Sequence, residues 1–360
     1  MITESAAVDQ NARLKDIHQN LRREIWQTLP REVKSNYRHQ GLAALARCLV
    51  GTQKIFSGKG LVCQPAGMDV LSFTVLPEVI ALWERAMHLA LGEMQKQIII
   101  GDGSGNYRSK GKPQSLVLPV FNFSHGAKLD SFVSRVCSSE FVLICDDDIF
   151  WTDSVPVKWA MESFEQDDKL AAVSFHPRPH LIPQLRGNMT EAMGSYAVII
   201  RREIWLKEKL SFQIYKPNDW KQIGNYFDTA DYANLLLVQR GYHVISAPEE
   251  LRQTLIPFYG TSMWALKILA SEGDIDRVVY SYRPDEHKKA YRTALALLGF
   301  RELLAKLAIK GVKPLVPVDC LQRTREVASK SLDSQTKKEV ENDIRSKLTR
   351  LSDRLFTTNK

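Results

Sequence analysis

Cysteine is scarce in this sequence, and the few residues present exclude two kinds of scaffold. The cysteines are Cys48, Cys63, Cys137, Cys145 and Cys320. Because their number is odd and no CxxC pair occurs, we expect neither a zinc ribbon nor a disulfide framework. Scattered thiols suit a reducing compartment, which favours a cytoplasmic protein.

Long apolar runs are missing as well. No run of about 18 apolar residues occurs, so we predict no membrane-spanning helix. The first residues, MITESAAVDQNARLKD, are polar and lack the apolar core of a secretory signal, so we expect no such signal. Internal repeats are absent too, and a hydrophobic fraction of 44% with 25% charged residues is ordinary for a globular protein.

Positive charge is in excess, and most of that excess lies near the end of the chain. Residues 285–360 hold 17 Lys and Arg against 10 Asp and Glu, which accounts for seven of the eight net positive charges. Such a segment suits peripheral contact with an anionic membrane, and a solvated helical surface explains the same charges. Because no nucleic-acid recognition motif accompanies them, we expect no nucleic-acid partner.

Hydrophobic periodicity divides the 360 residues into three parts. Residues 1–66 are predicted to be a helical N-terminal extension, since apolar residues recur at three- or four-residue spacing from Leu14 to Leu29, and a glycine-containing connector is predicted over 51–68. Residues 67–284 alternate short apolar runs with helical patterns. This alternation predicts an α/β domain with a mostly parallel sheet flanked by helices.

Individual elements follow from these patterns. Strands are predicted at 69–75, 97–100, 116–121, 141–145, 171–175, 194–200 and 242–246. Helices are predicted at 77–91, 126–138, 156–167 and 231–240. Residues 285–360 are predicted to be a basic helical C-terminal region. Its apolar face, formed by Phe300, Leu303, Leu304 and Leu307, suits packing on the main domain, which we favour, or interfacial membrane binding.

The stretch EFVLICDDDIFW, residues 140–151, carries the strongest chemical signal. Five apolar residues from Phe141 to Cys145 predict a buried strand. Asp146, Asp147 and Asp148 follow, and such adjacent carboxylates repel one another and are costly to desolvate. Strand alternation would place Asp146 and Asp148 on one side, a pair suited to a hard divalent cation and its phosphate ligands. A polar turn that caps the strand is the alternative.

Three further aspartates are candidates for a site. Asp102 ends a predicted strand in the sequence IIIGDGSG. Ligands of open α/β sheets bind outside the carboxyl ends of the strands, so Asp102 and the Asp146–Asp148 triplet could share one crevice. Asp228 and Asp231 precede a predicted helix. A carboxylate there suits a general base or a helix N-cap.

The order of these elements resembles the nucleotide-sugar-binding half of GT-A-fold glycosyltransferases, especially the inverting family 2, over roughly residues 68–265. The resemblance implies transfer of a sugar from a nucleotide-diphosphate-sugar to a saccharide or lipid-linked acceptor, with Mn²⁺ or Mg²⁺ as cofactor. It implies donor binding by Asp102, Lys128, Asp146, Asp147 and Arg201, metal binding by Asp146 and Asp148, and a general base at Asp228 or Asp231.

Two features depart from that family pattern. The acidic motif usually has adjacent Glu and Asp, whereas Asp228 and Asp231 are three positions apart. Many members also carry a His near a glycine-serine turn, whereas the similar stretch here, 257–262, contains none.

Two other functions fit some of the same residues. LICDDDIF is similar to the strand end of haloacid-dehalogenase-type phosphatases, although three predicted strands precede it here and Phe150 stands where Thr or Val follows in that family. A catalytically degenerate sugar-nucleotide-binding scaffold is the non-enzymatic alternative. It is favoured by the missing His, and the intact Asp triplet argues against it.

Overall fold

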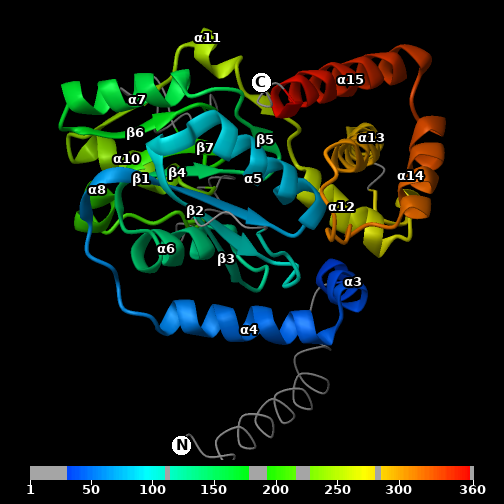
Figure 1. The fold of residues 1–360 in the computed structure, drawn as a ribbon, viewed down its shortest axis with the longest axis horizontal. Helices are drawn as coiled ribbons and strands as arrows, with labels where there is room; N and C mark the ends of the chain where they lie inside the picture. The colour runs from blue at the N-terminus through cyan, green and yellow to red at the C-terminus, as the bar shows by residue number, and fades with distance from the viewer. Residues whose placement is uncertain (1–30, 110–113, 178–192, 216–227, 280–284, 357–360) are drawn as a thin grey trace, which may run out of the picture.

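The computed structural model describes residues 31–109, 114–177, 193–215, 228–279 and 285–356. The predicted amphipathic pattern between Leu14 and Leu29 lies outside the described residues. Figure 1 shows a central sheet covered by helices on both faces.

The sheet has seven strands in the order β3-β2-β1-β4-β7-β6-β8. The strands are β1 (Gln64–Thr74), β2 (Gln95–Asp102), β3 (Ser115–Pro119), β4 (Ser139–Cys145), β6 (Leu170–Ser174), β7 (Ala197–Arg201) and β8 (His243–Ser246). Among the described strands of this sheet, β7 alone runs antiparallel to its neighbours, and the other pairings are parallel. The predicted α/β class with a mostly parallel sheet is therefore confirmed.

Helices and two short strands complete the described fold. The helices that bear on the site are α3 (Arg31–Gln40), α4 (Leu42–Ser57), α5 (Pro77–Leu91), α6 (His125–Arg135), α7 (Val155–Gln166), α8 (Arg202–Lys207), α10 (Asp231–Gln239) and α12 (Thr261–Ala270). The C-terminal helices are α13 (Asp285–Lys306), α14 (Val318–Lys330) and α15 (Ser334–Phe356). The strands β5 (Ile149–Phe150) and β9 (Ile256–Pro257) pair with each other in antiparallel fashion.

The crossover helices α5 and α6 cover opposite faces of the sheet. Successive side chains of a strand point to opposite faces, so each helix packs on a different set of them. In β1, Val70 packs in the cluster that contains α5, while its neighbour Leu71 packs in the cluster that contains α6. Helix α5 joins β1 to β2, and α6 joins β3 to β4. The chain thus adds β2 and β3 on one side of β1 and then places β4 on the other side of β1.

Helix α4 lies along the β3 edge of the sheet, and α3 packs against α12 (Figure 1). The predicted connector over 51–68 is wrong at both ends, because α4 continues to Ser57 and β1 begins at Gln64. Gly51 permits this packing, since a Cβ there would collide with the carbonyl oxygen of Pro119. Beside it, the amide of Phe121 donates to the Thr52 hydroxyl at 2.7 Å.

The C-terminal helices belong to the same hydrophobic core as α5. Phe300, Leu303 and Leu304 on α13 are buried in that cluster. The predicted packing of this face on the main domain is confirmed, and its interpretation as a membrane-binding face is wrong, because the side chains are covered by protein. Among the helices of the described residues, none is both long and apolar enough to cross a membrane.

Candidate functional site

The candidate site lies where the carboxyl ends of β1, β2 and β4 meet. Thr74 at the end of β1 is paired with Asp102 at the end of β2, and β4 lies on the other side of β1. Strand order reverses between β1 and β4, and ligands of doubly wound sheets bind at such a reversal. Asp146, Asp147 and Asp148 directly follow β4, so the triplet occupies this position.

Two carboxylates of the triplet are held by neighbouring elements. Asp147 accepts hydrogen bonds from the hydroxyl groups of Thr74 at 2.6 Å and Ser262 at 3.2 Å. Asp148 accepts one from the amide of Thr261 at 2.8 Å. Thr261 and Ser262 form the first turn of α12, and the positive end of a helix dipole stabilises carboxylates there.

Asp146 has different surroundings. Its side chain is half-buried, and among the described residues no group donates a hydrogen bond to its carboxylate. The predicted strand alternation is wrong, because β4 ends at Cys145 and the amide of Ile149 closes a turn on the Asp146 carbonyl at 3.2 Å. Asp147 and Asp148 therefore both turn towards α12, and the charge of Lys128 acts on the carboxylate of Asp146.

Burial and mutual repulsion raise the pKa values of the triplet. Burial raises the pKa of Asp147 to about 7, with Asp148 adding to the rise. Burial, followed by the charges of Asp148 and Asp147, raises the pKa of Asp146 well above its usual range. Burial also raises the pKa of Asp148, against the hydrogen bonds from Thr261. Each carboxylate would be stabilised by added positive charge.

Lys128 brings one such charge from the first turn of α6. The helix begins at the N-cap Ser124, whose hydroxyl accepts from the amide of Ala127 at 3.5 Å. The Lys128 side chain is buried, and its Nζ donates to Asn122 at 2.8 Å. Burial lowers the pKa of Lys128 to about 8, while Asp146 and Asp147 act in the opposite direction. This places the ammonium group within the field of the triplet.

Asp228 and Asp231 are both described, and their carboxylates have different partners. Asp231 is buried at the start of α10, and its Oδ2 accepts from the amide of Asp228 at 2.8 Å. The Asp228 carboxylate accepts from the amide of Thr229 at 2.8 Å. It also acts on His125, whose pKa burial and Lys128 lower to about 4 and Asp228 raises. The charge of Asp228 thus acts on His125, while Asp231 fixes the turn.

Asp102 is fully buried and its carboxylate organises the DGSG loop. Its Oδ1 accepts from the amide and hydroxyl of Ser104 at 2.8 and 2.6 Å, and its Oδ2 from the amide of Tyr107 at 2.8 Å. Tyr37 of α3 then donates its hydroxyl to the Gly103 carbonyl at 2.9 Å. Asp102 lies at the carboxyl end of β2, as predicted, and its carboxylate holds the loop. Donor binding by Asp102 stays a prediction.

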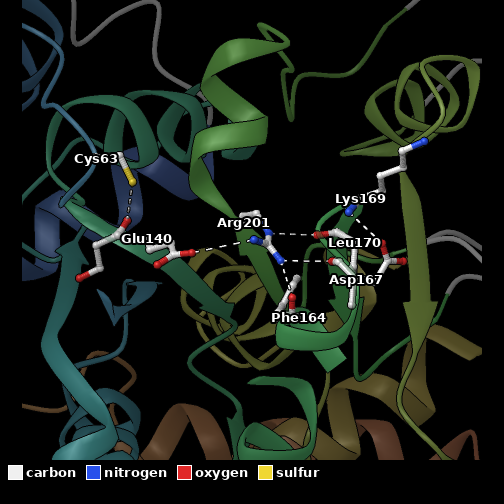
Figure 2. Close-up of polar contacts among 8 residues, drawn as sticks. Cys63, Glu140, Phe164, Asp167, Lys169, Leu170 and Arg201 are labelled. Carbon is white, nitrogen blue, oxygen red and sulfur yellow. Dashed lines mark hydrogen bonds and ion pairs between the residues drawn. The ribbon is translucent and has the colours of Figure 1, made fainter. Parts of the chain in front are cut away.

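Arg201 does not lie at the carboxyl ends of β1, β2 and β4. Because β7 is antiparallel to β4, Arg201 at its end pairs with Phe141 at the beginning of β4. Figure 2 shows its guanidinium surrounded by the carbonyls of Phe164, Asp167 and Leu170. An ion pair with Glu140 at 3.9 Å completes these contacts. Arg201 therefore joins β7 to α7 at the amino end of β4, whereas Asp146 follows its carboxyl end.

Sequence reasoning missed Arg292, Tyr259 and His176, which meet at the turn over 257–262. Arg292 of α13 donates to the Tyr259 carbonyl at 2.7 Å, and its charge lowers the pKa of Asp148. The Tyr259 hydroxyl lies 3.1 Å from His176 Nδ1. The turn at 257–262 lacks its own His, and His176 reaches it from the end of β6. No local motif marks these residues, since only the tertiary fold brings them together.

The site combines crowded carboxylates with basic groups from separate elements, which suits an anionic ligand that arrives with a cation. Among the described residues, no three His, Cys, Asp or Glu side chains form a ready metal-binding group. No family model matches this chain, and no curated protein matches it. The geometry and the motifs are therefore the grounds for a functional inference.

Proposed function

We propose that this chain is a GT-A-type glycosyltransferase that moves a sugar from a nucleotide-diphosphate-sugar to a saccharide or lipid-linked acceptor. The observation that carries this proposal is the position of the Asp146–Asp148 triplet and Lys128 beside the strand-order reversal between β1 and β4. A nucleoside diphosphate with a divalent cation suits such a mixture of charges. Inversion at the sugar carbon comes from the family resemblance and is part of the proposal.

The Asp triplet fits Mn²⁺ or Mg²⁺. Its carboxylates repel one another, and Asp146 accepts no hydrogen bond from the described residues. Hard cations prefer carboxylate oxygens, so we assign the ion to Asp146; Asp148 would join it only after leaving the amide of Thr261. Asp147, fixed by Thr74, would line the donor site. A bound ion neutralises the negative charge that develops on a leaving diphosphate.

Two basic side chains from different helices would bind the diphosphate. Lys128 lies on α6 and acts on Asp146 and Asp147. Arg292 lies on α13 and acts on Asp148. Arginine and lysine both bind phosphate oxygens through charge-assisted hydrogen bonds. We assign the diphosphate to Lys128 and Arg292, and Arg201 has no part in binding it.

Asp228 is the better general base of the two candidates. Its charge acts on His125, whereas Asp231 is buried and holds the amide of Asp228. A base must reach the acceptor hydroxyl in a plausible pose. We therefore assign proton abstraction to Asp228 and positioning of its turn to Asp231.

The test is a calorimetric panel of UDP, GDP, CMP and dTDP, each with and without Mn²⁺. The proposal expects one nucleotide to bind in a metal-dependent way. Equal affinity with and without Mn²⁺ would assign the diphosphate to Lys128 and Arg292 and would remove the cation from the proposal. A folded sample that binds none of the four would contradict the proposal.

A further inference from the structure

A cavity lies between α5, the loop that follows β2 and the chain that follows α13. Its volume is about 350 Å³, which is within the range of small-molecule sites. Ala81, Glu84, Arg85 and His88 of α5 form one wall, because residues spaced by three and four positions share a face of a helix. None of the described residues assigned above to the nucleotide lines this cavity.

The other two walls are held in place by hydrogen bonds. Both oxygens of Glu84 accept from the loop, one from the hydroxyl of Tyr107 at 2.6 Å and the other from the hydroxyl of Ser109 at 2.5 Å. After α13, the amide of Ile309 donates to the carbonyl of Leu304 at 3.0 Å, which closes the helix end. A cavity with walls fixed in this way loses little conformational freedom when a ligand enters.

Much of the lining is apolar. The hydroxyl of Tyr107 is engaged by Glu84, so its ring is the part that remains for a ligand to contact. The residues that offer apolar surface are Ala81, Tyr107, Ala308, Ile309 and Val312. A ligand that fills this cavity therefore needs an apolar body.

Cations outnumber carboxylates in the same lining. Arg85, Arg108 and Lys310 line the cavity, and Glu84 is the one carboxylate among its described lining residues. Over the described part of the chain, no ion pair joins any of these three cations to a carboxylate. The hydroxyl groups of the loop already occupy both oxygens of Glu84. The lining thus carries an excess of positive charge that an anion would balance.

The guanidinium group of Arg85 adds an unmet hydrogen bond. Its Nη2 donates to the carbonyl of Leu355 at 3.3 Å, whereas its Nε is buried and has no acceptor among the described residues. A buried donor without a partner costs free energy, and an added acceptor would recover it. Carboxylate and phosphate oxygens are the acceptors that a guanidinium group binds best.

We infer that this cavity binds a small ligand that joins an apolar body to one acidic group, at a place separate from the proposed nucleotide site. The apolar side chains cover the body of the ligand. Arg85, Arg108 and Lys310 bind its acidic oxygens through charge-assisted hydrogen bonds.

Photolabelling with 4-benzoylbenzoate tests this inference, since the probe combines an aromatic body with one carboxylate. Crosslinked residues are located by peptide mass spectrometry, and 4-benzoylbenzamide is the uncharged comparison. We expect saturable labelling within residues 81–88 or 307–312 by the acid, and half-saturation by the amide at a roughly tenfold higher concentration. Competition by phenylacetate indicates a carboxylate ligand, and competition by phenyl phosphate alone indicates a phosphate ester.

A matched pair of double variants makes the test decisive. Arg108→Gln with Lys310→Gln removes two exposed cations of the lining and should weaken labelling by the acid roughly tenfold, with labelling by the amide unchanged. Lys338→Gln with Arg345→Gln removes the same two kinds of charge from exposed positions on α15 and should change neither.

Four results would overturn the inference. They are equal labelling by the acid and the amide, undiminished labelling by the acid in the variant that lacks Arg108 and Lys310, labelling confined to residues outside the cavity, and no competition by either phenyl compound. No nucleotide or turnover enters the assay, so its failure is distinct from failure of the proposed function.

Discussion

At the scale of residues, the Asp triplet is a local cost to folding. Asp147 is buried, and its pKa is raised to about 7 by burial and by Asp148. An unfolded chain would release the same proton near pH 4. The folded state therefore binds more protons between about pH 4 and 7, and the free energy of unfolding should fall as the pH rises through that window.

Asp147→Asn tests this linkage, because the amide keeps an acceptor oxygen and cannot ionise. Without divalent cations, the variant should gain stability relative to the parent between pH 4.5 and 8, at up to about 1.4 kcal/mol per pH unit. Urea unfolding at both pH values provides the measurement. Asp168→Asn, an exposed change, serves as the control. A difference between Asp147→Asn and the parent that does not vary with pH would refute the raised pKa.

Asp228 and Asp231, at the start of α10, should differ in their effect on turnover. Asp228→Asn should keep nucleotide binding and lower turnover roughly 10²- to 10⁴-fold, because it removes the proposed base. Asp231→Asn retains an oxygen that can accept from the Asp228 amide, so turnover should change little. Release of nucleoside diphosphate from the donor identified by calorimetry measures both. Full turnover in Asp228→Asn would remove it from the mechanism.

Individual side chains were only partly predictable from the sequence. The position of Asp146 at a strand end follows from its apolar run, but the turn closed by Ile149 cancels the alternation expected of a strand. Arg201 was misassigned because the pattern of a short strand does not reveal its direction. Arg292 and His176 carry no local signal, since their neighbours are distant in the sequence.

At the scale of elements, α4 rests on the DGSG loop that follows β2. Gly105 has φ +67°, and a Cβ there would lie 2.6 Å from the Ala44 carbonyl oxygen of α4. Gly241 has a similar φ of +77° but has no atom within 4 Å of such a Cβ. The two positions share the cost of a left-handed backbone and differ in the contact with α4.

Alanine at each glycine isolates that contact. Gly241→Ala should lower the free energy of unfolding by about 1 kcal/mol through backbone strain. Gly105→Ala should cost about 1–3 kcal/mol more, because α4 must shift. Urea denaturation of both variants gives the comparison. Equal losses would mean that α4 does not constrain the loop.

Element prediction worked best where the sequence marks both ends. Pro77 begins α5 and Gly92 follows it with φ +53°, so the predicted bounds of 77–91 are confirmed. The connector over 51–68 was wrong because Gly51 sits inside α4, where it permits close approach to Pro119. A glycine that serves packing and a glycine that ends a helix look alike in the sequence.

At the scale of the whole molecule, the candidate site draws on distant parts of the chain. The Asp triplet follows β4, Lys128 comes from α6, and Arg292 comes from α13 in the region predicted to be a separate basic extension. That helix shares the core of α5. The sheet class follows from alternating patterns, whereas the contribution of α13 depends on tertiary packing that periodicity does not specify.

The central claim is that the Asp triplet binds a nucleoside diphosphate together with a divalent cation. Its most direct test is calorimetry of the nucleotide selected by the panel, with Mn²⁺, on the parent chain, Asp146→Asn and the control Asp168→Asn. We predict that Asp146→Asn loses the metal-dependent part of binding, while Asp168→Asn binds as the parent does. Unchanged Mn²⁺-dependent affinity in folded Asp146→Asn would contradict the claim.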